Sequence, residues 1–113
     1  MSRQISNDDI ASLCMELSLL LHAGVSTGDA LSLLAEEGVY QNMLKKMAEQ
    51  VDSGSTLSTA LRESGAFPIY VCGLVEVGER TGRTEEALAA LSRYYEDRVR
   101  LTRRVRSALL YPA

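Results

Sequence analysis

The chain has 113 residues, of which 46% are hydrophobic and 24% charged, and its formal net charge is −3. This length suits one domain with its own core. Because only 5% of the residues are aromatic and Trp is absent, Leu, Ala, Val and Met must fill that core. No β-branched run alternates with period two, which argues against a sheet. No apolar stretch reaches the roughly 18 residues that a membrane-spanning helix needs.

Glycines and hydroxyl residues divide the chain into six segments, each predicted to be a helix. The predicted helices begin near residues 7, 28, 40, 57, 69 and 84, and they end at Gly24, after Glu37, at Gly54, Gly65 and Gly82, and before Pro112. Apolar residues recur within them at helical spacing, as at Leu13, Leu17 and Leu20. We therefore expect an all-α fold in which residues 7–113 form one six-helix antiparallel bundle after a disordered segment, residues 1–6.

The last predicted helix is the longest, because neither Gly nor Pro interrupts it for about 26 residues, or roughly 40 Å. Residues three and four apart form an apolar seam along it: Leu88, Leu91, Tyr95, Val99, Thr102, Val105 and Leu109. The seam predicts a helix that outruns the bundle and still has a face to bury along most of its length.

A short pattern of helix stop, hydroxyl residue and new helix occurs three times. Gly24 leads to Ala30-Leu31, Gly54 leads to Ala60-Leu61, and Gly82 leads to Ala87-Leu88. Two interpretations stay open. Glycine stops and hydroxyl caps are common wherever helices are joined. Alternatively, the bundle repeats a helical hairpin and consists of two stacked three-helix halves.

Few residues are suited to catalysis or metal binding, since His22 is the only histidine and Cys14 and Cys72 lie in separate apolar segments. We expect no enzyme activity, no catalytic residue, no cofactor and no zinc site. His22 stands in the last turn of the first predicted helix, where a structural role is expected. The two thiols are expected to be reduced and buried.

Two carboxylates in the fifth predicted helix have a structural and a chemical interpretation. Glu76 and Glu79 stand four residues before Arg80 and Arg83, which predicts i,i+4 ion pairs. The alternative is a divalent cation bound by oxygen ligands near Glu76 and Glu79.

Charge is distributed unevenly along the chain. Residues 1–91 carry six basic and thirteen acidic side chains, whereas residues 92–113 carry six Arg and two acidic side chains. Five of these arginines are our candidates for a binding surface: Arg98, Arg100, Arg103, Arg104 and Arg106. They would form a solvated helix face, bind nucleic-acid phosphates or face anionic lipid headgroups.

The end of the sequence favours the membrane. Residues 108–113 turn apolar directly after the last arginine, and Tyr111 stands where a membrane interface favours tyrosine. We therefore expect the domain to end at the start of a membrane helix, with the arginines facing the membrane surface or an acidic partner.

Four segments together resemble the F domain of type II secretion and type IV pilus platform proteins. They are residues 17–25 (LSLLLHAGV) with 30–31, the Phe67-Pro68 turn with residues 74–82 (LVEVGERTG), residues 87–88 with 94–96, and residues 108–112 (ALLYP). The positions that carry this structural signature are Gly24, Phe67, Pro68, Gly78, Glu79, Gly82, Tyr111 and Pro112.

The resemblance implies a helical bundle that is the first of two such domains, on the cytoplasmic face of a multi-pass protein of the bacterial inner membrane. It implies the assembly ATPase, other inner-membrane assembly proteins, pilin-like subunits and a second copy as partners, and no nucleic acid. The domain would be a scaffold that couples the ATPase to pilin or pseudopilin assembly, with the last helix transmitting motion. The alternative function is a small helical nucleic-acid-binding module that uses the arginine-rich helix.

Overall fold

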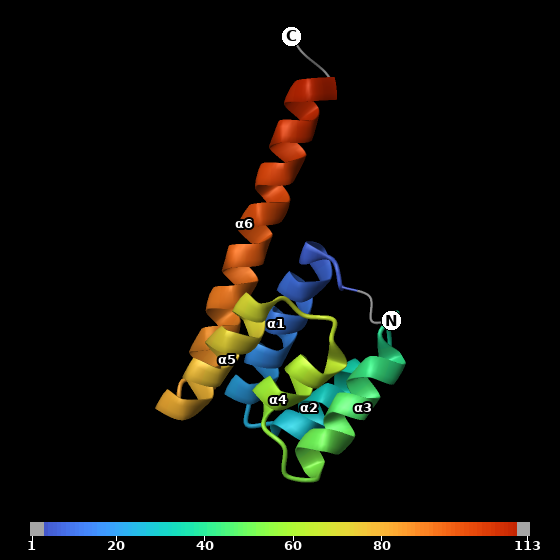
Figure 1. Ribbon diagram of the computed structural model, residues 1–113, viewed down its shortest axis with the longest axis vertical. Helices are drawn as coiled ribbons and strands as arrows, with labels where there is room; N and C mark the ends of the chain where they lie inside the picture. Colours follow the sequence, from blue (N-terminus) through green and yellow to red (C-terminus); the bar gives the residue numbers. More distant parts are fainter. Residues whose placement is uncertain (1–3, 111–113) are drawn as a thin grey trace.

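The computed structural model describes residues 4–110, and these residues form six helices and no strand (Figure 1). The helices are α1 (Asn7–His22), α2 (Thr27–Leu34), α3 (Gln41–Asp52), α4 (Leu57–Ser64), α5 (Ile69–Thr81) and α6 (Thr84–Leu110). The all-α bundle predicted from the sequence is confirmed.

The one helix that differs clearly from the prediction is α2, which ends at Leu34 and does not reach Glu37. No apolar residue between Ala35 and Val39 would give a longer helix a face to bury. The adjacent carboxylates of Glu36 and Glu37 would also lie at the negative end of the dipole of a longer α2, which opposes extension of the helix. Residues 35–39 therefore form turns that lead into α3.

Hydroxyl side chains cap the start of three of the helices. Ser6, Ser26 and Thr56 each accept a hydrogen bond from the backbone N–H three residues further on, at 3.2, 3.3 and 3.1 Å. Each bond satisfies an N–H that has no partner inside its helix.

The repeated pattern of the sequence has a structural counterpart in all three of its places. After α1, Gly24 has φ +93° and Val25 N–H donates to the Leu20 carbonyl at 3.0 Å; after α3, Gly54 has φ +111° and Ser55 N–H donates to the Gln50 carbonyl at 3.0 Å. At Gly82, φ is +70° and Arg83 N–H donates to the Gly78 carbonyl in the same way, but α6 begins only two residues later. What repeats is thus the turn between helices, and the division into three-helix halves stays a prediction.

α1, α5 and α6 pack together above α2, α3 and α4, and all six helices contribute residues to the core between them (Figure 1). α1 runs antiparallel to α6 and makes the most extensive contact in the molecule with it. The largest side chains that are less than 2% exposed come from all parts of the chain: Ile10, Leu31, Met47, Val71, Val75, Leu88 and Leu91. Cys14 and Cys72 are buried and form no disulfide, as expected, and burial raises the pKa of the Cys14 thiol to about 12.

Residues 4–6, which the sequence placed in a disordered segment, lie instead against the bundle. The Ile5 side chain is only 5% exposed, and its backbone N–H donates to the Ala66 carbonyl at 3.1 Å. Gln4 donates from its side chain to the Gly65 carbonyl at 3.1 Å. The reason is that the Ile5 side chain belongs to the buried core, beside the turn between α4 and α5. Residues 1–3 lie outside the described part of the chain.

The seam predicted along α6 is buried over only half of its length. Leu88, Leu91 and Tyr95 are buried and Val99 is half-buried, whereas every residue from 100 to 110 is exposed. α1 and α5 lie beside the N-terminal half of α6 and reach only to about its middle, where they begin at Asn7 and Ile69 (Figure 1). The prediction of a face buried along most of the helix is therefore wrong for this chain alone.

The two halves of the seam should respond differently to the same truncation. Leu91→Ala removes a side chain that is fully buried, so we expect the free energy of unfolding to fall by about 2–5 kcal/mol. Leu101→Ala, at a position that is 61% exposed, should change it by no more than about 0.5 kcal/mol. Urea unfolding of the two variants measures both values. Equal losses would mean that the C-terminal half of α6 folds back onto the bundle.

Candidate functional site

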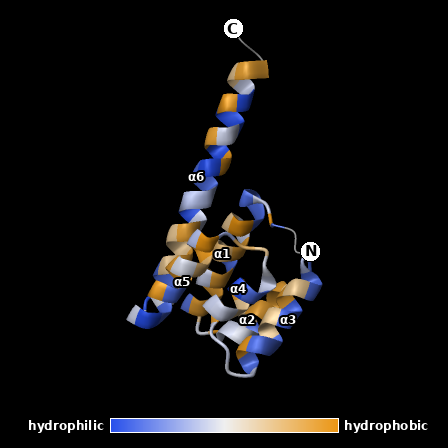
Figure 2. Ribbon diagram, viewed as in Figure 1, coloured by the Kyte–Doolittle hydropathy of each residue, from blue (hydrophilic) through white to orange (hydrophobic). Residues whose placement is uncertain are grey.

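The most prominent surface of the molecule is the part of α6 that extends beyond the bundle, residues 98–110, which we call the distal shaft. Its apolar residues Leu101, Val105 and Leu109 follow one another four apart and are 52–75% exposed. Charged residues separate them, so hydrophobic and hydrophilic segments alternate along the shaft in Figure 2. Within residues 4–110, none of the helices combines the length and the apolar composition that crossing a membrane requires.

Three of the five candidate arginines have partners within the chain. Arg98 donates to the Tyr94 hydroxyl at 3.2 Å, and its guanidinium lies 5.5 Å from the centre of that ring. Arg100 pairs with Asp97. Arg103 lies 3.9 Å from a carboxylate oxygen of Asp8 at the start of α1.

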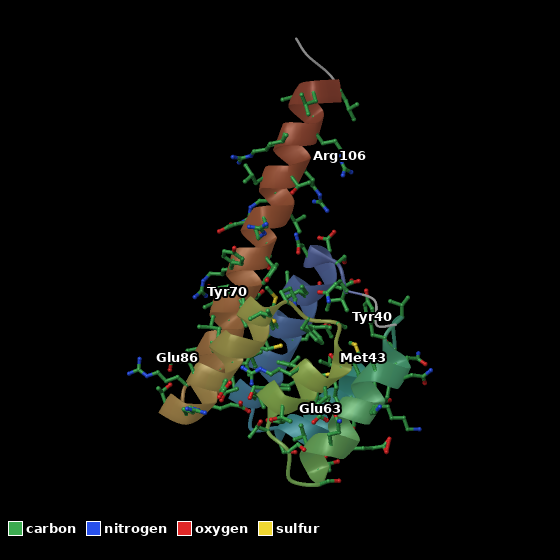
Figure 3. All side chains as sticks on the ribbon, viewed as in Figure 1. Tyr40, Met43, Glu63, Tyr70, Glu86 and Arg106 are labelled. Carbon is green, nitrogen blue, oxygen red and sulfur yellow. The ribbon has the colours of Figure 1, made fainter. Side chains whose placement is uncertain are left out.

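The other two arginines, Arg104 and Arg106, form no ion pair with any residue in the range 4–110. Figure 3 shows Arg106 on the part of α6 that stands clear of the other helices. Their charge is therefore not balanced by an ion pair within the described part of the chain.

The signature residues Gly78 and Gly82 build the corner between α5 and α6. Gly82 has φ +70°, a left-handed conformation that side chains disfavour. A Cβ atom at Gly78 would lie 2.8 Å from the Ala87 Cβ and 3.0 Å from the Arg83 carbonyl oxygen, so only glycine allows the two helices to approach this closely. Arg83 N–H closes the corner by donating to the Gly78 carbonyl at 2.7 Å.

Glu79 does not form the predicted ion pair with Arg83. Its carboxylate accepts hydrogen bonds from the backbone N–H groups of Leu57 at 2.8 Å and Ser58 at 3.4 Å, at the start of α4. The positive end of the α4 dipole competes successfully for this charge, because two unpaired N–H groups point at it. Arg83 instead lies 3.9 Å from Glu86.

Glu76 joins two helices through its carboxylate. It pairs with Arg80 at 2.7 Å, as predicted, and also with Arg62 of α4 at 2.5 Å. The hydrogen bond and the positive charge of Arg62 hold the pKa of Glu76 below its usual value. No local pattern in the sequence identifies Arg62 as a partner of Glu76, because the turn between α4 and α5 separates the two residues.

The alternative cation site near Glu76 and Glu79 is not assembled in the described residues. Both carboxylates already have protein partners, namely Arg62 and Arg80 for Glu76 and the start of α4 for Glu79. Residues 4–110 contain no group of three or more His, Cys, Asp or Glu side chains that is arranged to hold a metal ion.

The remaining signature positions and His22 lie at helix ends. Phe67 packs against the core, and Pro68 immediately precedes α5. His22, at the end of α1, has its Nδ1 3.0 Å from a carboxylate oxygen of Glu85 at the start of α6. Gly24 ends α1 as described above, whereas Tyr111 and Pro112 lie outside the described residues.

Comparison with known proteins identifies relatives along nearly the whole chain. Residues 13–113 match the family described as type II secretion system (T2SS), protein F. The protein transport protein HofC homolog of Escherichia coli is 34% identical over 98% of this chain and 29% of its own length. The type 4 fimbrial assembly protein PilC of Pseudomonas putida is 33% identical over 92% of this chain and 27% of its own.

A third relative, type II secretion system protein F of Pseudomonas aeruginosa, is 30% identical over 84% of this chain and 24% of its own length. The chain thus spans less than a third of the length of each of these relatives.

Two glycines of α5 provide a matched test of the corner between α5 and α6. Gly78→Ala must push α5 away from α6, so we expect it to lower the free energy of unfolding by about 1–3 kcal/mol. Gly73 has nothing within 4 Å of its missing Cβ, and Gly73→Ala should raise stability by about 0.5–1 kcal/mol through helix propensity alone. Thermal and urea unfolding distinguish the two, and a stabilised Gly78→Ala variant would contradict the packing described here.

Proposed function

Because the chain belongs to the family of type II secretion system protein F, we propose that it is a scaffold domain on the cytoplasmic face of a bacterial inner-membrane platform protein. The platform protein would serve a type II secretion or type IV pilus assembly machine. In this role the domain couples the assembly ATPase to the assembly of pilins or pseudopilins, and it acts by binding and not by catalysis. The observation that supports this proposal most directly is the distal shaft.

The shaft has the form of a lever. Its base is held between α1 and α5, where Leu88, Leu91 and Tyr95 are buried, and α6 then continues to Leu110 without a break. A continuous helix transmits displacement or rotation along its axis, which a flexible linker does less well. Movement of the bundle by the ATPase would therefore reach the far end of α6.

The composition of the shaft suits the surface of a membrane. Arg104 and Arg106 would bind anionic headgroups, while Leu101, Val105 and Leu109 would contact the apolar layer below them. This placement leaves the acidic bundle in the cytoplasm, where it is accessible to the ATPase, to other inner-membrane assembly proteins, to pilin-like subunits and to a second copy of the domain.

Membrane binding by the shaft can be measured with lipid vesicles. The 113-residue chain should co-sediment with vesicles that contain phosphatidylglycerol and not with vesicles of phosphatidylcholine. Arg104→Gln with Arg106→Gln should weaken this binding about 30-fold, since each basic residue near an anionic surface contributes about 1 kcal/mol. The control is Lys45→Gln with Lys46→Gln on α3, which removes the same charge from the bundle. Equal weakening by both pairs would contradict a specific role for the shaft.

Transmission along α6 can be tested in the full-length platform protein in its bacterium. Thr102→Pro interrupts the helix at an exposed position beyond the bundle, so the protein should still fold and bind the ATPase. We expect secretion or piliation to fall at least ten-fold, with unchanged amounts of the protein in the membrane, whereas Thr102→Ala keeps the helix and should behave like the native protein. Normal secretion by the proline variant would exclude a lever.

A further inference from the structure

A groove with an apolar floor and an acidic rim lies on the bundle between α1 and the connection from α2 to α3. It encloses about 550 Å³. Leu13, Leu34 and Leu44 line it, and Leu33 and Val39 stand beside them with exposed fractions of 49% and 84%. Apolar side chains this exposed around one hollow form a surface suited to another apolar segment.

The rim of the groove carries charge of one sign only. Its ionisable side chains include Asp9, Glu16, Glu36 and Glu37, and no lysine or arginine lines it. Glu16, Glu36 and Glu37 take part in no ion pair within residues 4–110. The field in the groove is therefore negative and unbalanced within the described part of the chain.

The position of Glu36 and Glu37 costs local stability. They follow the C-terminus of α2, where the helix dipole is negative, and they stand next to each other. Residues that destabilise the local structure, with no contact that compensates for the loss, are typical of functional surfaces.

A hydrogen bond links two of the elements that form the groove. The Tyr40 hydroxyl donates to a carboxylate oxygen of Asp9 at 2.8 Å and so ties the start of α3 to α1. This bond is the main reason that the pKa of Tyr40 is raised. Tyr40 and Val39 also border a second hollow of about 610 Å³ above Met43 and Ala66, so the surface continues past them. Figure 3 shows Tyr40 and Met43 at the edge of the bundle away from α6.

We propose that this groove binds a basic amphipathic segment of another protein, in which Lys or Arg side chains alternate with Leu or Ile at helical spacing. The apolar side chains of the segment would cover Leu13, Leu33 and Val39, and its cations would pair with Glu16, Glu36 and Glu37. The proposal is independent of the membrane role of the shaft, because none of the residues that line the groove belongs to α6.

The test uses two synthetic 14-residue peptides of identical composition, leucine and lysine only. One places its leucines on a single helix face, and the other has them scrambled. Titrated into the ¹⁵N-labelled 113-residue chain, the amphipathic peptide should shift the amide resonances of Leu13, Leu33 and Val39, and the scrambled peptide should bind at least ten-fold more weakly. Equal binding by both peptides, or shifts spread over every acidic part of the bundle, would overturn the proposal.

Matched variants separate the groove from general acidity. Glu36→Gln with Glu37→Gln should weaken binding of the amphipathic peptide about ten-fold at low salt, and Val39→Ser should weaken it without changing the charge. Glu85→Gln with Glu86→Gln removes the same charge at the start of α6 and should leave the affinity within two-fold. An equal loss in that control pair would refute a specific site.

Sedimentation of the chain alone decides between the proposed partner and a second copy. We expect the Glu36→Gln, Glu37→Gln variant to sediment like the unmodified chain. If the unmodified chain self-associates and this variant is monomeric, a second copy fills the groove, and the assignment to a different protein is wrong. Vesicle binding by the shaft is measured separately, so failure of one proposal does not imply failure of the other.

Discussion

The burial of one face of α6 against α1 and α5 is the contact on which the rest of the molecule depends. Leu88, Leu91 and Tyr95 lie in this contact, and the core residues Ile10, Val71 and Val75 belong to the same cluster. Because α6 has 27 residues and α1 only 16, packing along α1 must leave part of α6 uncovered. The shaft is thus a direct consequence of unequal helix lengths, and the apolar stripe along it continues a buried face into the open.

Three of the signature residues, Gly78, Glu79 and Gly82, fix this arrangement by packing and hydrogen bonding. Gly78 allows α5 to lie close against α6, and Gly82 turns the chain between them. Glu79 uses its charge at the start of α4, so the same short segment also positions a third helix. Residues that set the angles of a bundle are constrained by packing, whereas partner binding requires side chains that the bundle leaves free.

Within residues 4–110, the distal shaft and the groove beside Tyr40 are surfaces of this kind, and their chemistry is opposite. The distal shaft combines arginines with exposed leucine and valine, and the groove beside Tyr40 combines carboxylates with exposed leucine and valine. Each joins an apolar area to charge of a single sign, which gives both affinity and selectivity for a complementary partner. They lie on different elements, so one domain has the means to engage two partners of different charge at once.

The sequence by itself determined the helices, because caps, glycine stops and apolar periodicity act over a few residues: α1, α4, α5 and α6 begin near the predicted residues, and Gly65 and Gly82 end α4 and α5 as predicted. It also identified the arginines of the shaft and the residues of the signature. Only the tertiary structure decided which charges meet across helices, such as Arg62 with Glu76 and Glu79 with the start of α4. It alone also decided where the seam of α6 leaves the core, that Ile5 is buried, and that α1 and the α2–α3 connection enclose a groove. The physical reason is that these contacts join residues far apart in the chain, and no local period encodes the distance between them.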